Sequence, residues 1–385
     1  MPQAAVVIVG AGASGLSAAA ALKRCGVNPV VLEQDSAIGG TWARRYDSLH
    51  LHTVRAHSGL AHYPIPRCKP KYLSRDEYVA YLNEYARHFC LRIVANYEVR
   101  QVRMNPVPPV AWQIAGVHDS WHAPVAIVAT GQYRIPRVPP LPGLENFTGT
   151  FAHSADYRNA NPYVGKRVLV VGAGNSGAEI AANLVRQGAS FVAMSIRTAP
   201  PIVPRDPFGT PVQRTSMVLS LLPPRLADRI AKISARVVLG DLSRYGWRRP
   251  DWRPYSSRRV PVIDVGIVDV LKRGMLQIRP ALARLTPTQA VYADGRSEPF
   301  DAIIAATGFT TGLDFLLDTT QTLNGQGEPI APSGEPTSRP GLFFIGYTHS
   351  LRGHLFESNR ASRTLAANVI RYLQHASPNS LKTID

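Results

Sequence analysis

FTGTFAHSADYRNANPYVGKRVLVVGAGNSG, residues 147–177, contains the pattern that decides the fold. An apolar run at 167–171, typical of a buried strand, leads directly into a G-x-G-x-x-G turn at 172–177, and a helix-like run follows at 178–186. In such a turn the first glycine permits the tight bend, the second lets the backbone approach a pyrophosphate, and the third lets helix and strand pack closely. The phosphates then lie at the helix N-terminus. We therefore expect a dinucleotide site that includes Gly172, Gly174, Asn175, Ser176 and Gly177.

A second turn of the same kind, GAGASG at residues 10–15, lies near the start of the chain. It follows a predicted strand at 4–9 and opens an alanine-rich predicted helix at 13–25, and Glu33 ends the next predicted strand. An acidic residue about 20 positions beyond the turn is where a ribose hydroxyl is bound. A glycine pair at 39–40 would let the backbone approach a bound ring system. This first site is predicted to include Gly10, Gly12, Ser14, Gly15, Glu33, Gly40, Thr41 and Trp42.

Two such turns about 160 residues apart, roughly one domain length, predict that a single chain holds two dinucleotides. Two apolar strands also end in the same Ala-Thr-Gly sequence, which adds Thr130, Gly131, Thr307 and Gly308 to the predicted cofactor sites. The predicted fold class is α/β, with two Rossmann-like domains of which the second is inserted into the first. The expected boundaries are 1–150 and 290–385 for the first domain and 160–285 for the second, with a proline- and arginine-rich insertion at 198–261.

Outside the two turns, hydrophobic periodicity predicts helices at 75–90 and 358–373 and a helical patch at 226–239. A last strand is expected at 342–346. The insertion 198–261 is otherwise the least readable part of the sequence, and we expect substrate selectivity to reside there.

The two predicted domains differ at the ends of their second strands. Glu33 occupies this position in the first domain, whereas the second domain has Ser195-Ile-Arg197. This position has no carboxylate that would repel a 2′-phosphate. The planar guanidinium of arginine also matches phosphate geometry. Ser195 and Arg197 therefore favour NADPH over NADH in the second site.

The composition does not indicate nucleic-acid binding or a metal site. The net charge is +17, but the arginines are scattered except for a cluster between residues 244 and 259, and no nucleic-acid-binding motif accompanies them. Four histidines between residues 50 and 62 match no zinc spacing, because no acid or cysteine completes a site. We expect neither a nucleic-acid partner nor a metal.

The location expected from the sequence is cytoplasmic. The three cysteines, at positions 25, 68 and 90, stand far apart and are typical of reduced thiols. No apolar run reaches the roughly 18–20 residues of a membrane span. An apolar strand begins almost at the first residue with no basic segment before it, which is unlike a signal peptide.

The opening stretch also carries the fingerprint F-x-G-x-x-x-H-x-x-x-Y/F, as Phe147, Gly149, His153 and Tyr157. With this fingerprint, the two turns and the two Ala-Thr-Gly strand ends, the chain resembles the class B flavoprotein monooxygenases, the flavin-containing monooxygenase family, over nearly its whole length. Tyr157 favours this group over the related Baeyer–Villiger monooxygenases, which carry tryptophan there. Within the family the chain is most similar to the YUCCA-type indole-3-pyruvate monooxygenases. The similar stretches are 49–52, 240–246, 261–266, 301–309 and 346–348.

The resemblance implies that FAD is the first dinucleotide, that NADPH is the second and that O2 is a substrate. It implies that NADPH reduces FAD, that the reduced flavin forms a C4a-(hydro)peroxide, and that one oxygen atom passes to a small organic substrate. It also implies positioning roles for His153 and Tyr157 near the NADPH linker. His52 stands in the flavin loop, where typical animal members have asparagine, and is a third positioning candidate.

Several reactions remain open on the sequence alone. Oxidative decarboxylation of a 2-oxo acid such as indole-3-pyruvate is the first expectation. The alternative is N- or S-oxygenation or Baeyer–Villiger-type oxidation of an amine, sulfide, ketone or natural-product intermediate. A flavin reductase or a non-catalytic flavin-binding protein is a more remote reading, and the absence of a C-x-x-C motif opposes a disulfide reductase. The sequence determines neither the substrate nor the oligomeric state.

Overall fold

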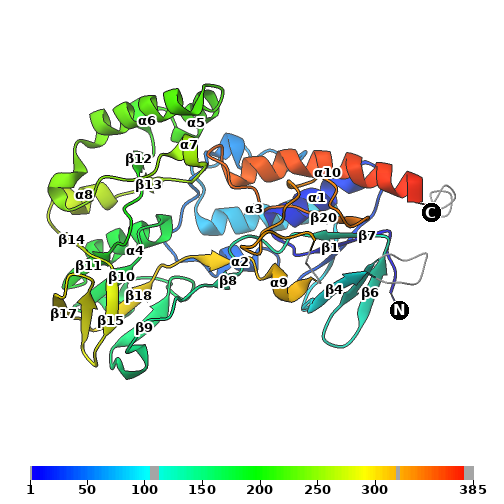
Figure 1. Cartoon of the computed structure of the whole chain (residues 1–385). Coiled ribbons are helices and arrows are strands. Elements are labelled where there is room, and N and C mark those ends of the chain that lie inside the picture. Colours follow the sequence, from blue (N-terminus) through cyan, green and yellow to red (C-terminus); the bar gives the residue numbers. More distant parts are fainter. Residues whose placement is uncertain (1, 105–111, 318–320, 377–385) are drawn as a thin grey trace.

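The computed structural model describes residues 2–104, 112–317 and 321–376. Two α/β units lie side by side (Figure 1). The first, mainly blue, cyan and red, contains both ends of the chain, and the second, green to yellow, is formed by the middle of the chain. Each unit is built on a five-stranded parallel sheet. The predicted α/β class, with one Rossmann-like unit inserted into another, is confirmed.

The first sheet has the strand order β20-β7-β1-β2-β3 and is covered on both faces. All residues of β1 (Val6–Val9) and β7 (Val125–Val128) are buried, as expected for parallel strands between two layers. Alternate strand residues pack on helices α1, α3 and α10 on one face, and on an antiparallel sheet of order β4-β5-β6 and helix α9 on the other. The bounds are β2 (Val30–Leu32), β3 (Arg92–Val94), β20 (Leu342–Phe344), β4 (Gln101–Met104), β5 (Trp112–Ala115), β6 (Ser120–Ala123), α1 (Ala13–Arg24), α3 (Arg75–His88), α9 (Leu313–Leu316) and α10 (His354–Ala376).

The second sheet repeats this plan with the strand order β14-β11-β10-β18-β9. One face packs on α4 and α8, and the other packs on an antiparallel sheet of order β15-β16-β17. The bounds are β9 (Thr150–His153), β10 (Arg167–Val171), β11 (Phe191–Ser195), β14 (Leu276–Arg279), β15 (Leu282–Leu285), β16 (Gln289–Tyr292), β17 (Ser297–Pro299), β18 (Ala302–Ala305), α4 (Asn175–Arg186) and α8 (Ile267–Lys272).

The segment that was hardest to read from sequence folds into a cap, which we define as residues 202–264. Its first and last strands, β12 (Ile202–Pro204) and β13 (Val262–Asp264), pair in parallel. Helices α5 (Val212–Leu219), α6 (Pro224–Leu239) and α7 (Pro254–Ser257) lie between them. Figure 1 shows α5 and α6 along the upper edge of the molecule, away from the second sheet. The cap also reaches the first unit, because the buried Gln213 amide accepts from Val54 N (2.9 Å) and donates to Arg352 O (2.6 Å).

The chain enters and leaves the second unit through one two-stranded antiparallel ribbon, formed by β8 (Ile135–Pro136) and β19 (Phe309–Thr310). The expected boundaries need correction here, because β9 and β18 pair with each other in the second sheet although they lie outside 160–285. Strand partners of this kind are not visible in a sequence. We therefore propose that the domain boundary lies at the ribbon.

Helix starts also differ from those predicted. Helix α10 begins at His354 rather than at 358, and α4 begins inside its turn at Asn175. The short elements are α2 (Gly40–Ala43) and the 3-10 helices Arg55–His57, Leu144–Asn146, Asn161–Tyr163, Pro207–Gly209 and Leu242–Tyr245. Across residues 2–104, 112–317 and 321–376, no helix combines the length and apolar character that crossing a bilayer requires.

Candidate active site

The two glycine-rich turns have the same geometry. Gly10 and Gly172 each open their turn with a φ of 108°, a conformation that favours glycine. A Cβ on Gly15 would overlap the carbonyl oxygen of Gly10, and a Cβ on Gly177 would overlap that of Gly172. These four glycines therefore shape the turns and allow each helix to pack closely on its strand.

The middle glycine of each turn faces open space. A Cβ at Gly12 or Gly174 would meet no atom within 4 Å. These residues are the N-caps of α1 and α4, and neither carries a side chain that caps its helix. The first backbone N–H groups of both helices are consequently available to a ligand, and they favour an anion.

Both turns open into one cavity of about 1000 Å³ between the two units. Its walls come from the two turns, the loop before α3, the segment after β7, the cap and the start of α10. A volume of this size lies at the upper end of the range for small-molecule sites. The predicted site residues that line it are Gly10, Gly12, Ser14, Glu33, Gly40, Thr41, Trp42, His52, Thr130, Gly131, Gly174, Asn175, Ser176 and Gly308.

The other predicted residues do not line the cavity: Gly15, Gly172, Gly177, Ser195, Arg197, Thr307, His153 and Tyr157. Ser195 is 2% exposed, and its hydroxyl donates to Pro280 O (2.8 Å) and accepts from Leu282 N (2.8 Å). Its side chain ties the end of β11 to β15, and its role in binding a cofactor stays a prediction. Arg197 is exposed just beyond β11.

Glu33 holds the backbone of the first turn and of the loop after β2 in place. Its Oε2 accepts from Ala11 N (2.6 Å) and its Oε1 accepts from Asp35 N (3.0 Å). Burial raises the pKa of this carboxyl, while the two backbone N–H groups act in the opposite direction. The carboxylate thus holds the loop in place and still faces the cavity.

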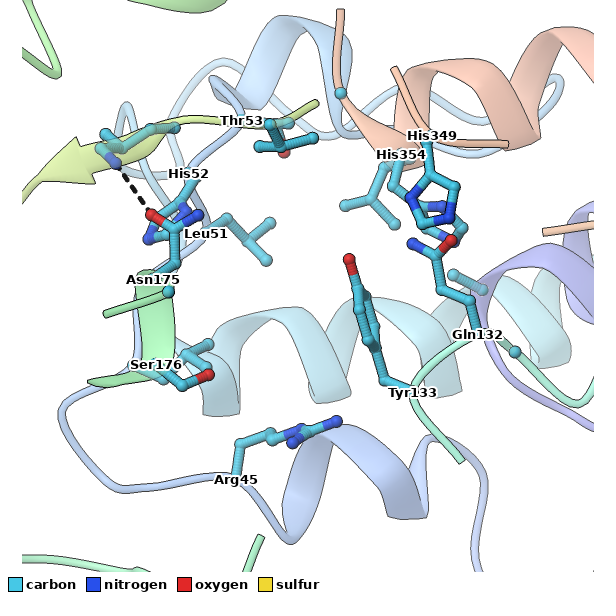
Figure 2. A pocket seen from close by; sticks show the side chains of 18 of the residues that line it. Arg45, Leu51, His52, Thr53, Gln132, Tyr133, Asn175, Ser176, His349 and His354 are labelled. Atoms are coloured by element: carbon cyan, nitrogen blue, oxygen red, sulfur yellow. Dashed lines mark hydrogen bonds between the residues drawn. The ribbon is translucent and has the colours of Figure 1, made fainter. Parts of the chain in front are cut away.

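His52 connects the two units at the cavity wall. It belongs to the loop before α3, and its Nε2 lies 2.6 Å from Oε1 of Glu179 on α4. Only 23% and 9% of the two side chains are exposed. Glu179 also lies near Tyr46, whose pKa is raised by burial and by this carboxylate. Figure 2 shows His52 beside Asn175, at the edge where the second turn enters the cavity.

His153 lies at the end of β9, next to the ribbon. Its Nδ1 accepts from Ala155 N (3.1 Å), so the ring is neutral with the proton on Nε2, which donates to Gly308 O (3.1 Å). Burial lowers the pKa of this imidazole. Its ring also packs edge-on against Phe309 of β19, with centroids 5.0 Å apart. His153 therefore secures the return of the chain from β18 to the ribbon and does not reach the cavity.

Tyr157 is a core residue of the second unit. It is 1% exposed, and its hydroxyl donates to Asn183 Oδ1 on α4 (2.6 Å). Its ring stacks on Tyr163 with centroids 5.8 Å apart and meets Tyr46 edge-on at 6.2 Å. These contacts fix the linker before β10 against α4.

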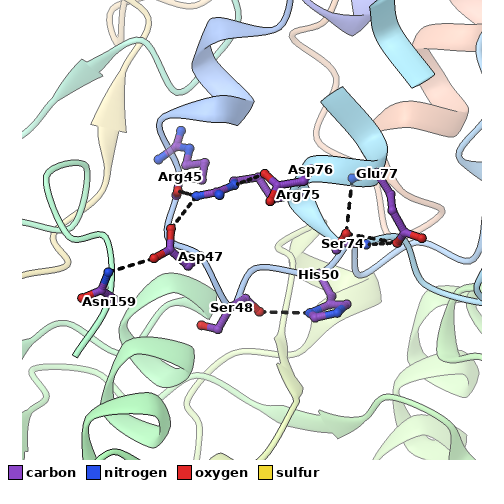
Figure 3. Close-up of polar contacts among 9 residues, drawn as sticks. All are labelled: Arg45, Asp47, Ser48, His50, Ser74, Arg75, Asp76, Glu77 and Asn159. Atoms are coloured by element: carbon purple, nitrogen blue, oxygen red, sulfur yellow. Dashed lines mark hydrogen bonds and ion pairs between the residues drawn. The ribbon is translucent and has the colours of Figure 1, made fainter. Parts of the chain in front are cut away.

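A second connection between the units lies outside the cavity (Figure 3). Arg75, at the start of α3, donates to the carbonyl of Arg45 (2.7 Å) and to Asp47 Oδ1 (2.8 Å). The other oxygen of Asp47 accepts from Asn159 Nδ2 (2.8 Å), which belongs to the second unit. The loop that carries Arg45 into the cavity is thereby tied to both units.

Several cavity residues were not found from the sequence: Arg45, Gln132, Tyr133, His349 and His354. Figure 2 shows Gln132, Tyr133 and His349 turned toward one another, with Arg45 below them. In the described part of the chain, Gln132 Oε1 and His354 Nδ1 are buried and have no hydrogen-bond partner. Burial also raises the pKa of Tyr133 and lowers that of His354. The position of Gln132 and Tyr133 directly after the Thr130-Gly131 strand end was the one available sequence signal.

Known proteins resemble this chain in both sequence and structure. Residues 7–205 match the family described as pyridine nucleotide-disulphide oxidoreductase. Rice (Oryza sativa subsp. japonica) indole-3-pyruvate monooxygenase YUCCA1 is 36% identical over 92% of this chain and 89% of its own length. Indole-3-pyruvate monooxygenase YUCCA6 of Arabidopsis thaliana is 33% identical over 89% of this chain and 85% of its own length. The chain belongs to the flavin-containing monooxygenase family.

Solved structures agree with this membership. A mutant of a flavin monooxygenase from Stenotrophomonas maltophilia covers 98% of the chain, with a TM-score of 0.74 and 27% identity. A steroid monooxygenase bound to NADP shares the fold, with a TM-score of 0.74 over 97% of this chain and 85% of its own, at 19% identity. The flavoprotein monooxygenase class, with FAD and NADP as its cofactors, is thus confirmed at the level of the family.

The cavity of this flavin monooxygenase fits two dinucleotides. Both open glycine positions leave room for a pyrophosphate, and the unpartnered Gln132 Oε1 and His354 Nδ1 can pair with polar edges of a ring system. Four arginines at its wall, Arg44, Arg45, Arg134 and Arg158, make the cavity attractive to phosphates. Within the described ranges, no cluster of His, Cys, Asp and Glu side chains is arranged to hold a metal.

Proposed function

We propose that the protein is an FAD- and NADPH-dependent monooxygenase whose one cavity brings both cofactors and a small organic substrate together. The observation that carries the proposal is that the open middle glycines of both turns border the same cavity. The first turn, with Glu33 and Trp42, would hold FAD, which supplies electron transfer and O2 activation when bound. The second turn, with Asn175 and Ser176, would hold NADPH.

We further propose a 2-oxo acid of the indole-3-pyruvate type as substrate. The relatives that match over most of this chain are named indole-3-pyruvate monooxygenases. The reaction would consume the 2-oxo acid, O2, NADPH and one proton, and would form CO2, the acid shortened by one carbon, NADP+ and water. The bond between the two carbonyl carbons breaks, one oxygen atom enters the new carboxyl group, and NADPH supplies the two electrons that reduce the other oxygen atom to water.

The cavity offers both kinds of contact that such a substrate needs. The guanidinium groups of Arg45 and Arg134 can attract a carboxylate. Leu51, Leu219 and Leu355 provide apolar surface for an aromatic ring. These residues come from the first unit and from the cap, so closure of the cap over the cavity would orient the substrate and exclude water.

Measured stoichiometry tests the function. With indole-3-pyruvate, we expect NADPH oxidation, O2 uptake and CO2 release in equal molar amounts, and little H2O2. NADPH oxidation that yields only H2O2, with no release of CO2 from any aromatic 2-oxo acid, would contradict the proposed substrate. Rapid oxygenation of a thioether or an amine in the same assay would favour the alternative reaction.

The preference for NADPH is proposed to depend on Arg197. Replacing Arg197 with Ala should raise the KM for NADPH about tenfold, the scale expected for losing one charge-assisted hydrogen bond, and should leave the KM for NADH nearly unchanged. Arg273→Ala is the matched control, because Arg273 is exposed on the same unit, where it pairs with Asp269. Equal rises in both KM values for Arg197→Ala would remove Arg197 from the 2′-phosphate site.

We also propose a cytoplasmic location. The three cysteines are exposed and unpaired, which suits a reducing compartment. Fractionation of cells that express the chain, followed by labelling of these thiols without prior reduction, would test this.

A further inference from the structure

Helix α6 of the cap exposes apolar side chains in a regular stripe. The apolar stripe consists of Leu226, Ile230, Ile233 and Val237, which are 45%, 38%, 57% and 68% exposed. Their spacing of three and four residues places them along one side of the helix, within roughly 60° of the helix circumference. Two exposed residues next to α6, Val218 and Leu221, extend the apolar surface and are 65% and 85% exposed. A surface of this kind usually marks an interaction site.

A row of cations lies directly beside the stripe. The basic row consists of Arg225, Arg229, Lys232 and Arg236, all exposed on α6. Among the salt bridges of the described residues, none involves a member of this row. The one acid of α6, Asp228, is 3% exposed and binds the backbone N–H groups of Tyr255 and Ser256 at the start of α7. Apart from the nearby carboxylate of Asp241, which interacts with Arg236, the positive charge of the row is therefore uncompensated.

The third side of α6 faces the protein. Ala231, Ser234 and Ala235 line the cavity, together with Ile230 at the edge of the apolar stripe, and Ala227 is fully buried. Around the helix, the order is therefore protein-facing side, basic row and apolar stripe. Figure 1 shows α6 along the outer edge of the molecule, where no other element covers it.

We propose that α6 docks the protein on an anionic lipid surface, with the apolar stripe inserted among the acyl chains and the basic row on the headgroups. Charge complementarity selects this occupant, since the four unpaired cations of the row match anionic headgroups and oppose a second copy of the same basic helix. The exposed arginines between residues 244 and 259 also lie on the cap and add to the attraction. Because the opposite side of α6 is a wall of the cavity, docking would bring that wall to the membrane surface.

Vesicle flotation of the full chain tests the proposal. We expect flotation with vesicles of equal phosphatidylcholine and phosphatidylglycerol, weaker flotation with pure phosphatidylcholine, and release at high salt. Ile233→Glu with Val237→Glu should abolish flotation. Phe315→Glu with Ile330→Glu is the matched control, because these side chains are 77% and 63% exposed on the first unit, and it should float like the wild type.

Variants that remove positive charges distinguish the effect of the basic row from the effect of the net positive charge of the protein. Replacing Arg229, Lys232 and Arg236 with Gln should weaken partitioning on the order of a hundredfold, at about 1 kcal/mol per cation near an anionic surface. Replacing three exposed cations elsewhere, Arg24, Arg87 and Arg284, with Gln should cost much less. Equal losses in the two variants would overturn the proposal. A second result would also overturn the proposal: the wild type does not float but self-associates, and Ile233→Glu with Val237→Glu abolishes the self-association. A second copy of the chain would then be the occupant of the apolar stripe.

Discussion

The glycines at the two turns divide into those that make the turn and those that leave space beside it. We predict that Gly12→Val leaves the free energy of unfolding of the flavin-free protein within about 1 kcal/mol of wild type, because a Cβ there meets nothing within 4 Å. The variant should nevertheless purify without flavin, since the new side chain fills the space for the pyrophosphate. Gly15→Val should instead destabilise the fold by about 3 kcal/mol or more, because its Cβ would overlap the Gly10 carbonyl. Flavin absorbance and urea denaturation distinguish these outcomes, and a fully yellow Gly12→Val protein would contradict the first-site proposal.

His153 should make stability depend on pH. Its Nδ1 accepts from Ala155 N, so protonation would place two N–H groups against each other. Arg45 opposes the charge and Asp156 favours it, but burial dominates and the folded-state pKa is lowered. The unfolded chain therefore binds more protons in the window below the ordinary histidine pKa of about 6.5. The stabilising contribution is fully present above that pH and is lost as the pH falls toward the folded pKa.

The test of this prediction compares the wild type with His153→Gln. The variant should have lower stability at neutral pH, by about 1 kcal/mol for a lost hydrogen bond, and a flatter dependence on pH between about 7 and 5.5. Urea denaturation at several pH values gives both quantities. Two parallel curves would show that His153 does not titrate in this window.

Among the elements, α7 is held by a single side chain of α6. Asp228 accepts from Tyr255 N (2.8 Å) and Ser256 N (3.0 Å) while 3% exposed. We predict that Asp228→Ala lowers the free energy of unfolding by about 1–3 kcal/mol, because two partly buried N–H groups lose their charged acceptor. Hydrogen exchange at these two amides should quicken, while the exposed Asp251→Ala control should leave it unchanged. Unaltered protection in Asp228→Ala would mean that α7 is held by other contacts.

The elements that could be predicted are those whose signal is local. Both turns, their flanking strands and their helices follow from the spacing of glycine and apolar residues in each stretch. The partnership of β9 with β18 could not be predicted, because it joins residues about 150 positions apart and leaves no mark in either strand. The same holds for the cavity positions of Arg45 and His349, which depend on how separate loops meet. In α6, the apolar residues 226–239 indicated a helix, but their pattern did not show that the apolar side faces solvent.

For the whole molecule, the link through Asp47 should limit movement between the units. Asp47 is half-exposed and accepts from Arg75 of the first unit and Asn159 of the second. We predict that Asp47→Ala changes overall stability by less than about 1 kcal/mol, as is usual for exposed pairs. It should however speed tryptic cleavage after Arg158, since the linker segment loses its side-chain bond between Asn159 and Asp47.

The matched control for this prediction is Glu98→Ala, which removes an exposed partner of Arg100 within a single unit. Cleavage after Arg158 should be the same in this control and in the wild type. If Asp47→Ala is cut no faster than Glu98→Ala, the linker is held by its remaining contacts, which include the bond from Asp47 N to Arg158 O (2.8 Å) and the stacking of Tyr157 on Tyr163.

The β8–β19 ribbon makes the second unit a cassette. Its incoming and outgoing strands are neighbours, with Ile135 opposite Thr310 and Pro136 opposite Phe309. The two junctions are therefore about one strand spacing apart, roughly 4.8 Å. We expect that the second unit of a relative can be grafted at this ribbon with two adjacent splice points and no new linker, if the contacts of Glu179, Asn159 and Gln213 with the first unit are kept. If the second unit binds NADPH as proposed, we expect that electron-donor preference can be exchanged as a module while the first unit stays unchanged.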